Sequence, residues 1–316
     1  ASCLVGSEMC IRDSWWNEVV VSNWEVAIVS NDQQVFAIWP YYIRKKGPWQ
    51  MITQPHFTPY SGIFINYPEN QKPSTKISFE KKTIKCLLDQ LPEFSEWKQN
   101  FHLGFKNTLP LIWNGFEDQK RFTYLLDLNQ DENEIFLNFR DNIRKQINKA
   151  QKTLQILEKD NSNDLKACFE SSFEAQGLKS PIDDSKIFQR IANYVQKYKC
   201  GNIYLAQDQS KKVHASICLI WDNKQAYYLI GGAQQEYKNS GAMSLLMWKS
   251  IQEAIKKNKA HFNFEGSSIE SIETYLRGFG GELTSFSCIY KSNSSSLKLA
   301  KKLSLIHISE PTRQEA

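Results

Sequence analysis

Three consecutive strand-like segments in the second half of the chain constrain its fold most strongly. They are NIYLAQD (202–208), VHASICLIWD (213–222) and QAYYLIGGA (225–233), and only short turn sequences separate them. Closely spaced runs of β-branched and aromatic residues predict antiparallel strands joined by hairpins. Because helix, strand, helix and strand patterns follow in that order, this region predicts a mixed α/β fold.

The first half of the chain also begins with short strands. Four strand-like runs at 24–30, 33–43, 49–55 and 62–66 are divided by Asn-Asp and Gly-Pro turn signals. Farther on, the pattern predicts a helix at 78–91, a strand at 121–128, one long helix at 132–152, a strand at 153–159, and helices at 164–176 and 184–198. A chain of this length and pattern is expected to form two domains.

Both ends of the chain resemble translated sequencing adapter. Codons of one library oligonucleotide read Met9 to Asp13 on one strand, and Leu303 to His307 on its reverse complement in another frame. Because such scars do not report on structure, we expect residues 1–14 and 303–316 to be adapter artefacts and 15–302 to be the natural part. Each tail carries one net negative charge, so the natural part has a formal charge of +7, against +5 for the whole chain.

This basic balance favours a polyanionic partner such as RNA, a phosphorylated donor or an anionic membrane surface, and it is equally typical of simple solubility. The five cysteines outside the tails are scattered and form no C-x-x-C pair. That pattern is typical of a reducing cytosol and not of a disulfide framework or zinc site. The histidines also lack ligand spacing, so we expect no metal ion.

The predicted helix at 132–152 has an apolar side and a cationic side. Its cationic side chains include Arg140, Arg144 and Lys145, which lie off the apolar stripe formed by Phe136, Phe139, Ile143, Ile147 and Ala150. An ordinary solvated face is the simpler interpretation of such a charge run. The functional interpretation is a surface that binds the phosphates of RNA or of a nucleotide-bearing donor.

A second candidate site is the loop between the strand that ends in Gly231-Gly232 and the next helix. Ser240, Gly241 and Ala242 open that helix, and Lys238 lies just before it. Free backbone N–H groups and the positive end of the helix dipole suit an anion. A plain helix start with small residues is the alternative.

Two further stretches carry candidate residues. TQPHFTPYSGIF (53–64) places Gln54, His56, Thr58 and Tyr60 in a loop after a strand, where binding residues often lie, although a structural turn is the simpler interpretation. Glu265 ends a strand-like run just before a glycine and a short helix. That position puts a carboxylate at a sheet edge, where ligands of open α/β sheets bind. The alternative is a solvated carboxylate.

Together, RDNIRKQINKAQK (140–152), the block 215–254 and FNFEGSSIESIETYLRGFGGEL (262–283) resemble the Fem-type branch of the GNAT acyltransferase superfamily, which includes the peptidoglycan-bridge aminoacyltransferases. The resemblance covers 122 to about 290 and extends more loosely into the loop at 54–64. It implies two tandem GNAT-like domains, each with a mixed, mostly antiparallel sheet flanked by helices. The first would be 15–121, rejoined by about 290–302, and the second, catalytic domain would be 122–289.

The resemblance implies transfer of an acyl or aminoacyl group to an amine of a cell-envelope precursor like that of peptidoglycan. In GNAT enzymes the residues that match Lys238 and Gly241 hold the pyrophosphate of coenzyme A, but Met243 departs from the small residue usual at its position. Fem-type enzymes carry a lysine where this chain has Leu276. The donor therefore stays open between aminoacyl-tRNA and acyl-coenzyme A.

The reaction needs a group that takes a proton from the amine and a donor for the oxyanion. We expect Glu265 to orient or deprotonate the amine, Arg277 to stabilise the oxyanion or a phosphate, and Tyr228 to line the cleft. The expected donor-binding residues are Lys238, Ser240, Gly241, Ala242, Arg140, Arg144 and Lys145, and the expected acceptor-binding residues are Gln54, His56, Thr58 and Tyr60.

Two other functions stay open. One is a coenzyme A-dependent N-acyltransferase of a metabolite or glycan amine, and the other is a catalytically silent GNAT-like module that binds RNA or a glycan. We expect no tightly bound cofactor and no DNA partner. We expect a cytoplasmic protein, and association with the inner face of the membrane would fit a lipid-linked acceptor.

Overall fold

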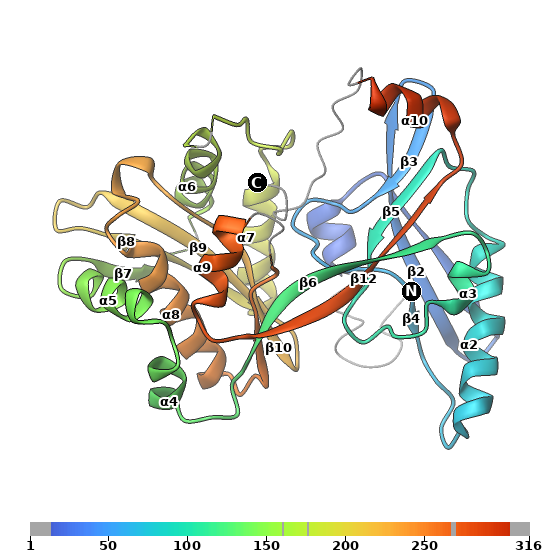
Figure 1. Cartoon of the computed structure of the whole chain (residues 1–316), viewed down its shortest axis with the longest axis horizontal. Coiled ribbons are helices and arrows are strands. Elements are labelled where there is room, and N and C mark those ends of the chain that lie inside the picture. Colours follow the sequence, from blue (N-terminus) through green and yellow to red (C-terminus); the bar gives the residue numbers. More distant parts are fainter. Residues whose placement is uncertain (1–13, 160, 176, 267–269, 304–316) are drawn as a thin grey trace. The chain divides into compact units, whose positions relative to one another are not determined.

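The computed structural model describes residues 14–159, 161–175, 177–266 and 270–303, so both adapter-like ends lie almost entirely outside the described residues. The chain forms two compact units. The described part of the first is 14–121 with 285–303, and that of the second is 122–284 without residues 160, 176 and 267–269 (Figure 1). The divisions fall within strands β6 (Glu117–Asp127) and β12 (Glu282–Ser292), so two strands carry the chain between the units.

The sheet of the first unit follows the order β1-β2-β3-β5-β12, with the short β4 paired to β2. Its strands are β1 (Trp24–Ser30), β2 (Val35–Lys46), β3 (Trp49–Thr53), β4 (Phe64–Ile65) and β5 (Glu96–Asn100). All of these pairs are antiparallel except β3 with β5. The unit also contains the π-helix η1 (Trp16–Val20) and helices α2 (Pro73–Leu88), α3 (Leu109–Ile112) and α10 (Ser295–Lys302).

Aromatic side chains fill the core of the first unit. Trp39 lies against Trp97 at 4.8 Å and Phe101 at 5.8 Å between ring centroids, in edge-to-face geometry. All three side chains are fully buried. Aromatic rings prefer this arrangement because the positive edge of one ring meets the negative face of the other.

The strands of the second unit follow the order β6-β11-β10-β9-β8-β7. The strands not yet introduced are β7 (Gln155–Glu158), β8 (Gly201–Gln207), β9 (Val213–Trp221), β10 (Gln225–Ala233) and β11 (His261–Asn263). Only β10 and β11 pair in parallel. The remaining elements are α4 (Glu132–Leu137), α5 (Asp141–Ala150), α6 (Ser162–Glu174), α7 (Ile187–Tyr198), η2 (Gln235–Tyr237), α8 (Ala242–Lys256) and α9 (Glu270–Arg277).

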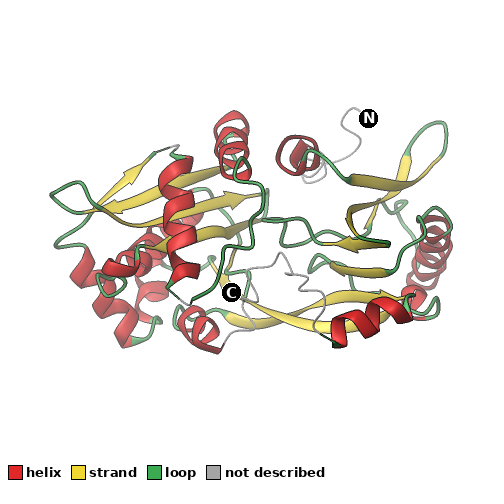
Figure 2. Cartoon of the chain, turned by 90° about the horizontal axis from the view of Figure 1, so that it is seen from above, coloured by secondary structure: helices red, strands yellow, loops and turns green. Residues whose placement is uncertain are grey.

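Helices cover both faces of this sheet (Figure 2). Two successive glycines of β10 show which helix lies on which face, because neighbouring residues of a strand point to opposite sides. A Cβ on Gly231 would lie 3.1 Å from Met243 of α8, whereas a Cβ on Gly232 would lie 2.2 Å from the carbonyl oxygen of Cys168 in α6. The two glycines therefore let α8 and α6 approach the same strand from opposite sides.

The long helix predicted at 132–152 is instead two helices, α4 and α5, with a break at 138–140. The segment that contains Gly278 causes the break. The backbone N–H of Arg140 donates to the carbonyl of Gly278 at 2.9 Å, and Phe139 packs against Phe279 and Trp248 at 5.2 and 5.3 Å. The continuous periodicity of the sequence gives no sign of this break, because its cause lies about 140 residues farther along the chain.

Candidate functional site

The candidate site lies where β10 and β11 separate. The two parallel strands pair only from Gln225 with His261 to Tyr227 with Asn263. Strand β10 then continues to Ala233, whereas the chain turns away after β11. Ligands of α/β sheets bind beyond the carboxyl ends of parallel strands, where neighbouring connections diverge. Tyr228 directly follows the last paired residue of β10, and Glu265 comes two residues after the last paired residue of β11.

A constrained turn holds Glu265 at this point. Glu265 has φ of 59° and is only 6% exposed, and Gly266 follows with φ of 62°. A Cβ on Gly266 would lie 2.1 Å from the carbonyl oxygen of Phe122, so β6 leaves room only for glycine. Non-glycine residues adopt positive φ at an energetic cost, and such residues concentrate at functional sites. The burial of Glu265 argues against a solvated strand-end carboxylate.

The side chain of Asn263 holds the turn in place by hydrogen bonds. Its Oδ1 accepts one hydrogen bond from the backbone N–H of Glu265 at 2.8 Å and another from the hydroxyl of Thr123 at 2.7 Å. Both Asn263 and Thr123 are fully buried. Sequence analysis did not single out either residue, although a buried polar pair beside a strand end is the kind of contact that positions a functional side chain.

The start of α8 lies close to the separated strands. Gly241 has φ of 80°, and a Cβ there would lie 2.5 Å from the carbonyl oxygen of Gln146 in α5. The side chain of Ser240 accepts a hydrogen bond from Ala242 N–H at 3.3 Å. Helix α8 thus begins at a glycine that permits close contact with α5, and its first turn presents backbone N–H groups at the positive end of the helix dipole.

Several hydroxyl groups gather around this helix start. Ser244 donates to the side chain of Gln146 at 2.7 Å and lies 3.2 Å from the hydroxyl of Tyr275 in α9. The buried Tyr228 reaches the same side of the sheet, since a Cβ on Gly231 would lie 2.7 Å from its hydroxyl oxygen. Of these residues only Tyr228 was predicted. The others come from α5, α8 and α9, which the chain brings together only on folding.

Arg277 belongs to a charged group at the end of α9. Its Nε pairs with Glu273 Oε1 at 2.9 Å, and Glu273 also accepts a hydrogen bond from the hydroxyl of Tyr124. The bond from Tyr124 and the charge of Arg277 lower the pKa of Glu273, whereas burial and Glu273 raise the pKa of Tyr124. Arg140 also contributes positive charge near Tyr124 and donates to the carbonyl of Thr274 at 3.5 Å. Two of the predicted cationic residues, Arg140 and Arg277, are therefore together.

The position that resembles the Fem-type lysine is occupied by a core residue. Leu276 is 2% exposed and packs in the apolar core of the second unit. Arg277, the next residue, is about half exposed. The cationic side chain at this end of α9, Arg277, therefore lies one residue after the position of the Fem-type lysine.

The remaining predicted donor-binding residues differ in their surroundings. Arg144 pairs with Asp141 and donates to the carbonyl of Leu137 at 2.7 Å, so its guanidinium stabilises the break between α4 and α5. Lys145 and Lys238 are exposed. Lys149, another exposed residue of α5, donates to the carbonyl of Asn239 at 3.3 Å and so brings the cationic side of α5 next to the loop that precedes α8.

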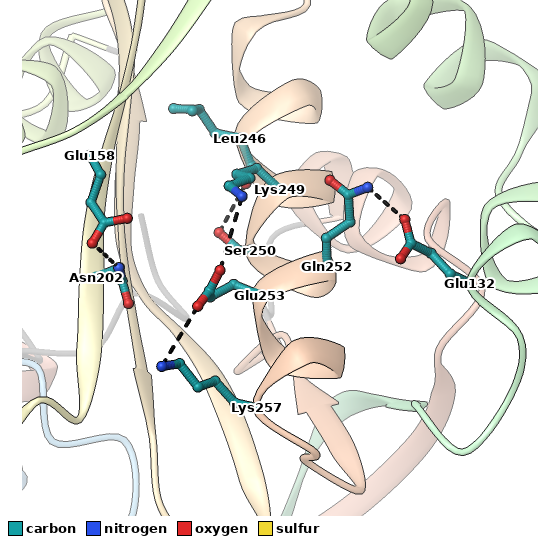
Figure 3. A network of polar contacts seen from close by, with 9 residues as sticks. All are labelled: Glu132, Glu158, Asn202, Leu246, Lys249, Ser250, Gln252, Glu253 and Lys257. Atoms are coloured by element: carbon teal, nitrogen blue, oxygen red, sulfur yellow. Dashed lines mark hydrogen bonds and ion pairs between the residues drawn. The ribbon is translucent and has the colours of Figure 1, made fainter.

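Polar contacts of α8 lie both within the helix and between the helix and α4 (Figure 3). The buried carboxylate of Glu253 lies 4.0 Å from the ammonium of Lys249 and 3.9 Å from that of Lys257. Gln252 donates to Glu132 of α4 at 2.6 Å. The two ion pairs stabilise α8 internally, and the hydrogen bond from Gln252 joins the helix to α4.

The four predicted acceptor residues lie in the first unit, in the loop after β3. The buried side chain of Gln54 accepts from the backbone N–H of Asn100 and from Ser61 at 3.1 Å each, and its amide donates to the carbonyl of Thr58. Thr58 in turn accepts from the indole of Trp15 at 2.9 Å. Tyr60 packs edge-on against Phe286 at 5.1 Å, and His56 is partly exposed. Gln54 and Thr58 thus shape the loop, and acceptor binding by all four stays a prediction.

Two further observations concern the described residues alone. No group of three or more His, Cys, Asp or Glu side chains in this part of the chain could hold a metal ion. None of the helices described is both long enough and apolar enough to cross a membrane.

A family model matches part of the second unit. Residues 138–271 match the acetyltransferase (GNAT) domain. The match includes β10, the start of α8 and β11 with Glu265, which together form the candidate site. The match and the fold support an acyltransferase. A search of curated protein sequences finds no match.

Solved structures extend the similarity to both units. FemX is 11% identical, with a TM-score of 0.65 over 95% of this chain and 99% of that chain. The C-terminal domain of a putative lysylphosphatidylglycerol synthetase from Agrobacterium fabrum is 11% identical, with a TM-score of 0.56 over 94% and 93%. A tandem GNAT protein from the clavulanic acid biosynthesis pathway is 8% identical, with a TM-score of 0.52 over 85% and 82%. These similarities confirm the predicted mixed α/β fold of tandem GNAT-like domains and its resemblance to the Fem type.

Proposed function

We propose that this protein transfers an acyl or aminoacyl group to an amine acceptor, and that the acceptor is a cell-envelope precursor of the peptidoglycan type. The observation that carries the proposal is the separation of β10 from β11 beside the first turn of α8, with the buried Glu265 at the separation. The structural similarity to FemX covers nearly the whole of both chains and supports a peptidoglycan-type precursor as the acceptor.

The reaction we propose has a simple balance of bonds. The acceptor nitrogen attacks the donor carbonyl, a C–N bond forms, and the C–O bond of an ester or the C–S bond of a thioester breaks. The proton of the amine passes to the carboxylate of Glu265, and from there to the departing oxygen or sulfur. Arg277 supplies positive charge to the oxyanion or a donor phosphate, and Tyr228 lines the space where the groups meet.

The donor we propose binds at the loop that precedes α8. Lys238, Ser240, Gly241 and Ala242 lie at the helix start, where backbone N–H groups suit a phosphate, and the cationic side of α5 with Arg140 and Lys145 extends this surface. Aminoacyl-tRNA and acyl-coenzyme A both carry phosphates that fit. We expect neither donor to remain tightly bound, and we propose no metal and no DNA partner.

Coenzyme A as the donor is favoured by one specific observation. Leu276, which stands where Fem-type enzymes carry a lysine, is part of the core and cannot reach a ligand. A coenzyme A-dependent N-acyltransferase of a metabolite or glycan amine is therefore the second candidate function. It uses the same helix start and the same carboxylate, so the two candidates differ in donor and acceptor only.

Calorimetric titration with acetyl-coenzyme A, aminoacylated tRNA and uncharged tRNA at two salt concentrations tests the proposal. Binding of aminoacylated tRNA that weakens as salt rises supports aminoacyl transfer, whereas saturable binding of acetyl-coenzyme A alone supports the second candidate. Lys238→Glu should weaken either donor. Lys256→Glu, a matched reversal at the other end of α8, should not, since about 20 Å separates the helix ends. Failure to bind any of the three ligands overturns the proposal.

The role of Glu265 is tested by turnover once a donor binds. Glu265→Gln keeps the shape of the side chain and removes the carboxylate, so it should reduce transfer to a lysine-bearing, nucleotide-linked peptidoglycan precursor by about 100-fold or more while donor affinity is retained. Undiminished transfer by this variant would rule out the assigned role.

A further inference from the structure

Short helix α3 of the first unit exposes an apolar face. Leu109, Ile112 and Trp113 are 53%, 42% and 61% exposed, respectively. Their spacing of three and four residues places them on one side of the helical turn. Pro110 and Leu111 on the other side are buried, so α3 is already anchored and does not need these three side chains for packing.

Helix α2 continues this face. The two helices are in contact (Figure 1), and the ammonium of Lys81 lies 5.2 Å from the ring centre of Trp113. Ile77, four residues before Lys81, is 57% exposed, and Lys85, four residues after it, is also exposed. Residues spaced by four lie in a row along a helix. The α2–α3 surface, as we call it, consists of Ile77, Lys81, Lys85, Leu109, Ile112 and Trp113.

The charge of this surface is positive. Helix α2 contains four lysines, and its one acidic residue, Glu80, is buried. Glu80 accepts hydrogen bonds from the hydroxyl of Tyr67 at 2.8 Å and from the amide of Asn107 at 2.6 Å, so it faces inward. Helix α3 contains no charged residue. Lys76 of α2 lies 4.0 Å from the ring centre of Tyr67, which precedes the helix, and forms a second pair of lysine and aromatic ring.

We propose that the α2–α3 surface binds the protein reversibly to an anionic phospholipid bilayer. Tryptophan and lysine favour the interfacial region of a membrane, where the ring meets the acyl boundary and the ammonium meets lipid phosphates. Exposed leucine and isoleucine side chains enter the apolar layer beneath. A nucleic acid would use the lysines and leave the four apolar side chains in water, so the combination of charges and apolar groups fits a bilayer better.

This proposal is independent of the donor and of the candidate site in the second unit. It accounts for exposed side chains that neither the fold nor acyl transfer requires. It would bring the enzyme to the surface where a lipid-linked acceptor resides, but its test does not depend on activity.

Co-sedimentation of the whole chain with vesicles tests the proposal. We expect binding to vesicles of phosphatidylcholine mixed with phosphatidylglycerol, weaker binding at high salt, and little binding to phosphatidylcholine alone. Leu109→Ser combined with Trp113→Ser, and separately Lys81→Gln combined with Lys85→Gln, should each weaken binding about tenfold or more. Leu137→Ser is the matched control, because Leu137 of α4 is 63% exposed and lies outside the surface.

A second measurement applies if the serine variant fails to fold. Trp113→Phe is a mild change, and comparison with the unaltered chain isolates the fluorescence of Trp113. Lipids brominated near the headgroup should quench that component on binding. Absence of binding to the anionic vesicles, unaltered binding by the lysine variant, or no quenching of Trp113 would each overturn the proposal and point to a protein partner for this surface.

Discussion

The Oδ1 atom of Asn263 accepts a hydrogen bond from the backbone N–H of Glu265 at 2.8 Å. The last residue of β11 therefore holds the backbone of the turn that carries the candidate carboxylate. The hydroxyl of Thr123 in β6 donates to the same atom. The site therefore depends on two buried polar side chains that do not themselves take part in the proposed reaction.

Asn263→Ala should destabilise the protein and impair transfer. The change leaves a buried N–H and a buried hydroxyl without their acceptor, which costs about 1–3 kcal/mol. It also releases the turn that carries Glu265. Urea denaturation measures the first effect, and turnover measured well below the denaturation midpoint measures the second. Asn133→Ala, at an exposed position of α4, serves as control. Equal stability of the two variants would contradict the role given to Asn263.

Gly266→Ala should be more harmful than the same change at another glycine with positive φ. Gly266 and Gly177 have φ of 62° and 71°, so both substitutions strain the backbone, at about 1–2 kcal/mol. A Cβ at Gly266 would meet the carbonyl oxygen of Phe122 at 2.1 Å, whereas nothing lies within 4 Å of one at Gly177. We expect a clear additional loss of unfolding free energy for Gly266→Ala in parallel denaturation curves. Indistinguishable denaturation curves would show that the backbone of β6 moves to make room for the added Cβ.

Helices and strands that are indicated by a local residue pattern could be predicted from the sequence. The segment predicted at 225–233 is β10, and the three successive strands of the second unit form hairpins as expected. Helix α2 begins at Pro73, five residues earlier than predicted, because proline fits the first turn of a helix, where no N–H donor is needed. The break between α4 and α5 was missed because a distant segment causes it.

The candidate site was predictable only in part. A carboxylate between a strand and a glycine is visible in the sequence, and so is a glycine at a helix start. The positive φ of Glu265, its burial and its support by Asn263 arise from close contact with β6 and leave no local signal. The grouping of Ser244, Gln146 and Tyr275 likewise depends on three helices that meet only in the folded chain.

Removal of the carboxylate in Glu273→Gln should change how stability depends on pH. The hydrogen bond from Tyr124 and the charge of Arg277 lower the pKa of Glu273 in the folded state. Because the pKa of Glu273 is lower in the folded state, its carboxylate stabilises the folded protein at pH values above the unfolded pKa of about 4.3. This stabilisation is lost as the pH falls through the lower pKa of the folded state. The variant should therefore be less stable than the unaltered chain at pH 7, by no more than about 1 kcal/mol because the pair is solvated.

Thermal denaturation at a series of pH values measures this difference. It should shrink as the pH is lowered below about 4. Glu270→Gln removes an exposed carboxylate from the first turn of the same helix and is the control, because it leaves the contacts of Glu273 with Tyr124 and Arg277 in place. A difference between Glu273→Gln and the unaltered chain that stays constant across this range would contradict the assigned ionic contribution.

Alkylation of the folded protein should distinguish buried from exposed thiols. Burial raises the pKa of Cys168 to about 12 and that of Cys200 to about 11, whereas Cys86 is exposed on α2. Only the thiolate reacts with iodoacetamide, so at pH 8 both low accessibility and low thiolate content protect Cys168 and Cys200. Peptide mapping by mass spectrometry should find rapid modification of Cys86 and protection of the two buried residues until denaturant is added. Modification of Cys168 at a rate similar to that of Cys86 would show that α6 opens readily from β10, against the close packing at Gly232.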